Sequence, residues 1–158
     1  MADDKASSDP FDLGRFLAAQ EGAYERALGE LKGGRKKSHW MWYIFPQIEG
    51  LGTSAYSRNY SIKSLGEARS YLSHPILGPR LRECCEALMQ LQGLSASAVF
   101  GFPDDVKLNS SMTLFSVAAG PASIFQKVLE KYFSGERDDK TLEILKRLGG
   151  EDRGSSFF

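Results

Sequence analysis

The sequence predicts an all-α protein built as one compact domain of six or seven helices. In segment after segment, apolar residues recur every three or four positions, which is the spacing of one helix face. Short connections rich in glycine and proline separate these segments, and none of the segments alternates apolar and polar residues as a half-buried strand does. The length of 158 residues suits a single domain, and 42% hydrophobic with 25% charged residues is an ordinary globular composition.

The first helix is expected over residues 12–31, where apolar side chains form one stripe and Gly33 with Gly34 provides the stop. Residues 1–8 are small and charged and have no apolar period, so they are expected to be a disordered lead-in. The helical domain is therefore predicted to span residues 9–149.

Residues 37–47 come next and hold both tryptophans and one of the two histidines. Their aromatic rings carry more apolar area than the segment can bury by itself, so the rest of the chain must cover it. The apolar run from Trp40 to Phe45 is continuous, and it fits a buried helical turn as well as a short buried strand. Pro46 ends the element in either case.

Residues 50–61 mix small residues, hydroxyls and tyrosines without a period, which predicts a long loop. We expect this loop to form the rim of whatever the aromatic segment lines. Ser64 and Glu67 then form a capping box, and the helix that follows reaches about residue 72.

The second half of the chain repeats the helical pattern between glycine and proline breaks. Helices are expected over residues 77–91, 104–119, 124–133 and 139–148, with a short turn at 95–100. Asp138 or Asp139 caps the last helix, which is expected to end at Gly149 and Gly150. Residues 150–158 lack a period and are predicted to be a flexible tail.

Composition and motifs exclude several classes of function. Twenty basic and twenty acidic residues leave no net charge to attract a nucleic acid polymer, so none is expected as a partner. No apolar run approaches the ~20 residues that span a bilayer, and no signal-peptide core is present, which predicts a cytoplasmic protein without a membrane partner. Glycine-rich phosphate loops, metal-ligand spacings and a nucleophile elbow are missing, so neither a metal nor a cofactor is expected. Cys84 and Cys85 are adjacent in a predicted helix, where their side chains point about 100° apart, so both are expected to be free thiols.

The first candidate for a binding site is the aromatic segment. His39 and Gln47 flank the aromatic wall of Trp40 and Trp42, and an apolar lining with a few polar groups is what a small-molecule pocket needs. The alternative interpretation is that the aromatic residues are core and that His39 is hydrogen-bonded within it.

A second polar cluster lies in the helix predicted at residues 104–119. Asp104, Lys107 and Ser111 share one face of that helix, which is either simply solvated or completes the pocket. The site prediction is a small-molecule ligand with His39 as the catalytic acid/base, because histidine is the side chain best suited to proton transfer near neutral pH. The ligand-binding residues expected with it are Trp40, Trp42, Gln47, Ser54, Lys107 and Ser111.

Three segments resemble the domain-of-unknown-function family 1810, namely residues 9–16 (DPFDLGRF), 38–47 (SHWMWYIFPQ) and 107–115 (KLNSSMTLF), and the resemblance extends over residues 9–149. It implies an all-helical, single-domain, mostly bacterial protein with no settled activity. Some members carry the label calpastatin by automatic transfer, but nothing in this chain resembles a protease-inhibitor repeat.

A second resemblance, in the order of elements alone, is to the helical ADP-ribose glycosidases. Members of that family also pair an early aromatic motif with a later helical pattern like that of residues 112–125. The resemblance implies an N-glycosidase or another hydrolase of a nucleotide derivative. This chain departs from the family at the acidic residue beside the aromatic motif, where His39 and Gln47 stand instead.

Two hypotheses from different classes follow. The first is binding or processing of a nucleotide-like, ADP-ribose-related small molecule in an aromatic and polar pocket. The alternative is a non-catalytic protein-interaction module without a small-molecule site, whose partner the sequence does not identify. The two differ in whether His39, Gln47 and Lys107 converge on one cavity.

Overall fold

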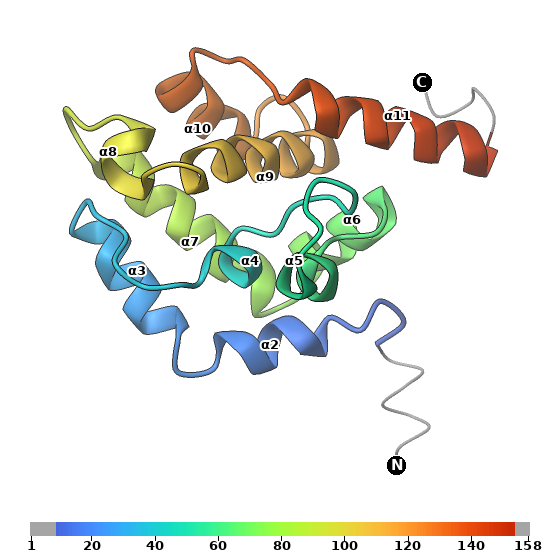
Figure 1. Cartoon of the computed structure of the whole chain (residues 1–158), viewed down its shortest axis with the longest axis horizontal. Coiled ribbons are helices and arrows are strands. Elements are labelled where there is room, and N and C mark those ends of the chain that lie inside the picture. Colours follow the sequence, from blue (N-terminus) through green and yellow to red (C-terminus); the bar gives the residue numbers. More distant parts are fainter. Residues whose placement is uncertain (1–8, 154–158) are drawn as a thin grey trace.

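The computed structural model describes residues 9–153, with side chains described for residues 9–149. Within that range the chain forms ten helices and no strand, which confirms the all-α prediction (Figure 1). The helices are α2 (Gly14–Gln20), α3 (Tyr24–Lys32), α4 (Met41–Ile44), α5 (Ala55–Tyr60), α6 (Leu65–Ser73), α7 (Leu77–Gln90), α8 (Ala96–Phe100), α9 (Asp104–Ala119), α10 (Ile124–Phe133) and α11 (Asp139–Arg153). The lead-in predicted at residues 1–8 and the end of the predicted tail, residues 154–158, lie outside the described range.

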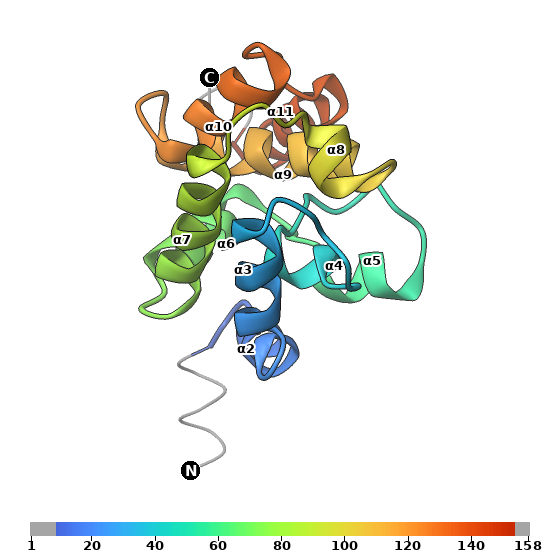
Figure 2. The same ribbon diagram turned by 90° about the vertical axis from the view of Figure 1, so that its left-hand side faces the viewer.

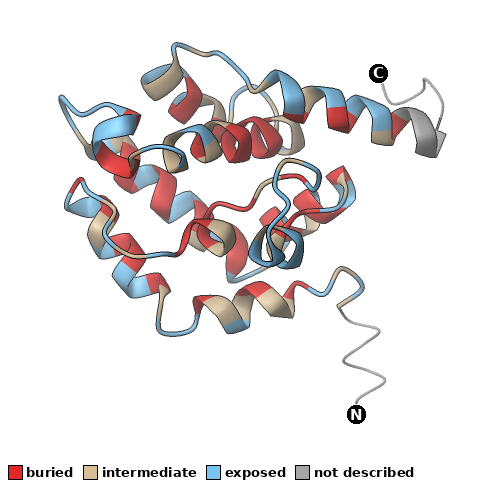
Figure 3. Ribbon diagram, in the orientation of Figure 1, coloured by how far each residue is buried: buried red, intermediate tan, exposed pale blue. Residues whose placement is uncertain are grey.

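Helix α9 is the centre of the fold, because α6, α8, α10 and α11 all pack against it. Figures 1 and 2 show α8–α11 on one side of the molecule and α2–α5 on the other, with α7 running between them. Residues 110–116 of α9 are all buried (Figure 3), so this stretch is covered on every face. The hydroxyls of Ser111 and Ser116 are enclosed there without a hydrogen-bond partner among the described residues.

The prediction of one helix over residues 12–31 is wrong, because the chain turns between α2 and α3. At the turn Gly22 has a φ of 76°, a left-handed conformation that other residues adopt only at a cost. The apolar spacing continues on both sides of the turn, with Phe16 and Leu28 both buried, so periodicity alone did not reveal it. This break, together with the short helices α4, α5 and α8, raises the helix count above the expected six or seven.

Two other predicted boundaries are also wrong. Residues 50–61 are not a loop throughout, because α5 forms there with Ser54 as its cap, whose hydroxyl accepts a hydrogen bond from the Ser57 N–H at 3.0 Å. The last helix, α11, continues through Gly149 and Gly150 to Arg153.

The residues between α4 and α6 leave and rejoin the fold at one isolated bridge. Ile48 and Ile62 pair there in parallel, and both side chains are buried. The Glu49 N–H donates to the Ile62 carbonyl, and the Ile62 N–H donates to the Gln47 carbonyl, both at 2.8 Å. The bridge therefore anchors both ends of the 49–61 excursion to the core.

The aromatic segment contains one helical turn, α4, which decides between the two structures that its pattern allowed. Glu30 on α3 fixes the approach to this turn. Its carboxylate accepts four hydrogen bonds of 2.6–3.0 Å, from the Lys37 and Ser38 N–H groups, the Ser38 hydroxyl and the Trp40 indole. Burial by itself raises the pKa of Glu30, but these hydrogen bonds outweigh it and lower the pKa to about 2.

The cysteine prediction is confirmed, because Cys84 and Cys85 are both free. Both side chains lie fully inside the core on α7. Burial raises the pKa of Cys84 to about 12, so the thiol stays protonated and unreactive. Among the described residues, no helix is long and apolar enough to cross a membrane.

The crossing of α6 and α7 gives a test of the packing. A Cβ placed on Gly78 of α7 would lie 2.1 Å from the Leu72 carbonyl oxygen of α6, so the two backbones touch there. Gly78→Ala must push the helices apart, and we expect it to lower the free energy of unfolding by about 1–3 kcal/mol in urea titrations. The matched control is Gly29→Ala in the interior of α3, where a Cβ meets nothing within 4 Å. That change should instead stabilise by about 0.5–1 kcal/mol, and equal effects at the two sites would contradict this account of the crossing.

The Glu30 carboxylate gives a test with a defined pH window. Its folded pKa of about 2 lies below the ordinary 4.5, so its stabilisation is fully present above pH 4.5 and is lost as the pH falls towards 2. Glu30→Gln should cost about 1–3 kcal/mol at pH 7 and progressively less in acid, measured from urea midpoints. Glu86→Gln, at an exposed position of α7, serves as the control. If the difference in free energy of unfolding between wild type and the Glu30 variant stayed the same from pH 7 to pH 3, this role of the Glu30 carboxylate would be contradicted.

Candidate functional site

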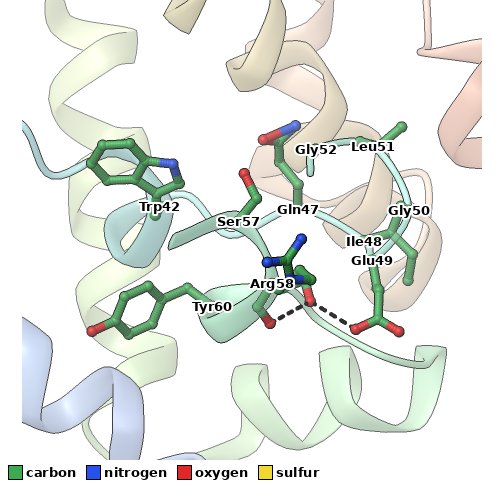
Figure 4. Close-up of a pocket in the computed structure, with 11 residues that line it drawn as sticks. Trp42, Gln47, Ile48, Glu49, Gly50, Leu51, Gly52, Ser57, Arg58 and Tyr60 are labelled. Atoms are coloured by element: carbon green, nitrogen blue, oxygen red, sulfur yellow. Dashed lines mark hydrogen bonds between the residues drawn. The ribbon is translucent and has the colours of Figure 1, made fainter. Parts of the chain in front are cut away.

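Two neighbouring cavities lie along residues 47–57, and the second of them also reaches the start of α9. The first lies beside Trp42 and Tyr60 (Figure 4) and has room for about 30 Å³, enough for a water molecule. The second, which we name the α9 cleft, measures about 280 Å³, near the lower end of the ~300–1,000 Å³ of ligand pockets. The residues that line the α9 cleft are Gln47, Leu51, Gly52, Ser57, Phe102, Pro103, Val106, Lys107, Ser110 and Asp138.

The two cavities are adjacent because they share one wall. Gln47 and Ser57 line both, together with Leu51 and Gly52. A Cβ on Gly52 would lie 2.5 Å from the Ser57 Oγ, so the absence of a side chain lets the excursion fold back on itself here. The Ser57 hydroxyl lies at the boundary between the cavities and accepts a hydrogen bond from the Ser54 hydroxyl at 3.0 Å.

Trp42 is half-buried on α4 and is bracketed by two neighbours. The Tyr56 ring stacks on it, with ring centres 4.8 Å apart and an angle of 24° between the planes. The Nζ of Lys107 lies 5.5 Å from the centre of the Trp42 ring, which is a cation–π distance. Both neighbours compete with any flat ligand ring for the faces of this tryptophan.

Lys107 faces the α9 cleft with a half-buried ammonium group. Its nearest carboxylate oxygen is Asp104 Oδ1 at 3.8 Å, while Asp104 Oδ2 makes a shorter ion pair of 2.8 Å with Lys36. The Lys36 side chain is only 7% exposed and also donates to the Ser38 carbonyl at 2.6 Å. Asp104 is thus mainly committed to Lys36, and the Lys107 Nζ makes no hydrogen bond within residues 9–149.

Two further donors lie near Lys107. Within the described side chains, neither the Trp42 indole N–H nor the Gln47 amide makes a hydrogen bond. In Figure 4 the Gln47 amide and the Ser57 hydroxyl point to the same side of the segment, and the indole nitrogen of Trp42 faces towards them. The site therefore presents an indole N–H and an amide without an acceptor among the described side chains, and an ammonium whose nearest carboxylate oxygen is 3.8 Å away.

Asp138 is the acidic group of the α9 cleft. Its Oδ2 accepts hydrogen bonds from the Ser110 hydroxyl at 3.1 Å, the Thr141 N–H at 3.1 Å and the Thr141 hydroxyl at 2.5 Å. These contacts make Asp138 the cap of α11, one of the two caps that the sequence predicted. Its Oδ1 receives no hydrogen bond from the part of the chain that the structure describes.

The structure brings three of the predicted site residues together, Trp42, Gln47 and Lys107. The other four line neither cavity. His39 is exposed, Ser54 is the exposed cap of α5, and Ser111 is enclosed within α9. Trp40 is 1% exposed and its indole is bonded to Glu30, so it is a core residue.

Sequence reasoning passed over two residues of the α9 cleft. Phe102 is 83% exposed at the edge of the α9 cleft, but in the sequence it marked only a break beside Pro103. Asp138 was explained by capping alone. The described residues contain no group of three or more histidine, cysteine, aspartate or glutamate side chains arranged to hold a metal ion.

Comparisons with known proteins place the chain in a family. No curated protein matches it. Among solved structures, it is similar to the conserved hypothetical protein Rv1873 from Mycobacterium tuberculosis, with 50% sequence identity and a TM-score of 0.85. That match covers 87% of this chain and 98% of the other. A family model, described as a protein of unknown function (DUF1810), matches residues 10–145, and the chain belongs to this family.

Proposed function

We propose that this protein binds a nucleotide-like small molecule in the α9 cleft. The observation that carries the proposal is that two donors line the cleft without a hydrogen bond to the described side chains, the Gln47 amide and the Lys107 ammonium, whose Asp104 partner lies 3.8 Å away. Water reaches these donors in the free protein, and a ligand rich in acceptor oxygens can take its place. A phosphate group is such a ligand, and a lysine ammonium is a common partner for it.

The base of the ligand has an apolar surface next to the donors. Phe102 and Val106 are 83% and 51% exposed, and both line the α9 cleft. A base that stacks on an aromatic ring gains ~1–3 kcal/mol, a figure taken from single-stranded nucleic acids. Because Tyr56 and Lys107 already occupy Trp42, the free ring of Phe102 is the better platform.

The proposal is one of binding, and it assigns no reaction to His39. An N-glycosidase or other hydrolase of an ADP-ribose-related ligand needs an acid or base beside the bound molecule. His39 is exposed and lies outside both cavities, so it does not supply that group in this geometry.

A second candidate function rests on the same apolar side chains. Exposed Phe102 and Val106 also suit a protein-interaction surface, in which a partner covers them and no small molecule is bound. The two candidates differ in the role of Lys107, because only nucleotide binding requires its ammonium group.

A thermal-shift experiment with AMP, ADP and ADP-ribose separates the two candidates. A nucleotide at 100 times its dissociation constant adds about 2.7 kcal/mol to stability, or roughly 5–10 °C in melting temperature for a domain of this size. We expect at least one of the three to give such a shift with the wild-type protein, and Lys107→Met to abolish it while leaving the melting temperature of the free protein within a few degrees.

The matched control is Lys127→Met, which removes an exposed ammonium on α10, away from the α9 cleft. The control should keep the full shift. If none of the nucleotides raises the melting temperature of the wild-type protein, the proposal fails and the protein-interaction surface becomes the favoured candidate. If the Lys107 variant keeps the shift, the ligand binds elsewhere.

A further inference from the structure

We infer that residues 50–58, which we name the lid, open as one unit to admit a ligand to the α9 cleft, and that the stack of Tyr56 on Trp42 is the latch of this lid. The inference rests on the proposed function for its ligand, but the movement of the lid can be measured without one. Its starting point is the contrast between the lid and the segments that anchor it at either end.

The lid contributes little to the packing of the protein. None of its residues is buried, only Leu51 and Ser57 are half-buried, and α5 lies at the edge of the molecule in Figure 2. Among the described residues, the hydrogen-bond partners of the lid all lie within the 49–61 excursion. The Ser57 and Arg58 N–H groups, for example, both donate to Ser54. A segment with so few buried contacts opens at a small cost in free energy.

The segments on either side of the lid are fixed to the core. Ile48 and Ile62 are buried and form the bridge, which joins the two segments to each other. Arg15 on α2 holds the second segment, because its guanidinium donates to the carbonyls of Asn59 and Ser61, each at 2.7 Å. The lid therefore has a firm anchor at each end, and it can open without disturbing either.

A stacked pair of rings connects the lid to α4. The Tyr56 ring lies 4.8 Å from the Trp42 ring at an angle of 24°, although Tyr56 is 58% exposed. Leu51 is the one apolar lid side chain that also packs partly against the core. A stacked aromatic pair changes an equilibrium about two- to tenfold. The latch therefore favours the closed position of the lid without locking it.

The closed α9 cleft is small for a nucleotide. Its volume of about 280 Å³ lies just below the ~300–1,000 Å³ of ligand pockets. The opposite wall cannot yield, because Ser110 there begins the stretch of α9 that is covered on every face. Leu51, Gly52 and Ser57 belong to the lid and form most of the wall that the two cavities share. Opening the lid therefore joins the α9 cleft to the cavity beside Trp42.

The lid also sets the apparent affinity of the α9 cleft. When a ligand binds only the open form, its apparent dissociation constant equals the intrinsic constant divided by the fraction of open molecules. Removing the Tyr56 ring weakens the latch and raises that fraction, so binding becomes tighter. If the Tyr56 ring were instead a fixed part of the binding surface, its removal would weaken binding.

The first test is hydrogen exchange of the full chain without a ligand, followed by NMR at single amides. We expect Tyr56→Ala to lower the protection factors of the Ser57 and Arg58 N–H groups about two- to tenfold, and to leave those of Glu49 and Ile62 at the bridge within a factor of two. Alanine favours a helix more than tyrosine does, so an effect through α5 alone would raise protection. Unchanged or higher protection at Ser57 and Arg58, or an equal loss at the bridge, would overturn the inference.

The second test is isothermal titration calorimetry with AMP, ADP and ADP-ribose. Tyr56→Ala should bind at least one of them about two- to tenfold more tightly than the wild-type protein. The control Asn59→Gly weakens α5 but leaves the stacked rings in place, so it should bind as the wild type does. Equal or weaker binding by Tyr56→Ala, or a matching gain in the control, would overturn the role of the lid. If none of the three nucleotides binds to the wild-type protein, the proposed function is overturned, and the exchange experiment alone decides whether the lid opens.

Discussion

The hydrogen bonds to the Glu30 carboxylate are the interaction on which the rest of the structure depends. They hold the chain between α3 and α4 in one path, and that path puts the Trp40 ring into the core. With Trp40 fixed inside, the one-turn helix α4 must present Trp42 on the outside. Lys36, in the same stretch, joins its N–H to the Val99 carbonyl at 2.8 Å and its ammonium to Asp104. The chain that leads into the aromatic segment and the start of α9 are thereby tied together.

Much of the fold could be predicted from apolar spacing, because most of its helices bury one stripe against a neighbour. The helices α6, α7 and α10 are examples, and the Ser64 cap of α6 had a local signal as well. The turn at Gly22 could not be found in this way. Both helices beside it pack towards the same core, so the spacing of apolar residues continues as if the helix did. Helix α5 has no buried residue, and a helix without an apolar stripe leaves no periodic signal.

The candidate site was predicted in part, for a reason that lies in helix geometry. Successive residues of a helical turn point about 100° apart, so adjacent aromatic rings cannot all face one cavity. The sequence shows that Trp40 and Trp42 are apolar and large, but the choice of which one faces outward is made by Glu30, ten residues before Trp40. Asp138 and Phe102 line the same cleft because α11 packs against α9. No sequence pattern within either segment predicts that the two residues line one cleft.

The bridge between Ile48 and Ile62 also bears on how this site changes in evolution. Both ends of the 49–61 excursion are held by the same two buried residues and their backbone hydrogen bonds. The entropy of closing a loop grows only slowly with its length, so insertions beyond the bridge cost little folding free energy. They would reshape one wall of the α9 cleft while the helices beneath it stay as they are. The bridge therefore separates a segment that tolerates insertions, residues 49–61, from the helices, whose packing must be kept. Ligand preference can change through that segment without a loss of folding stability.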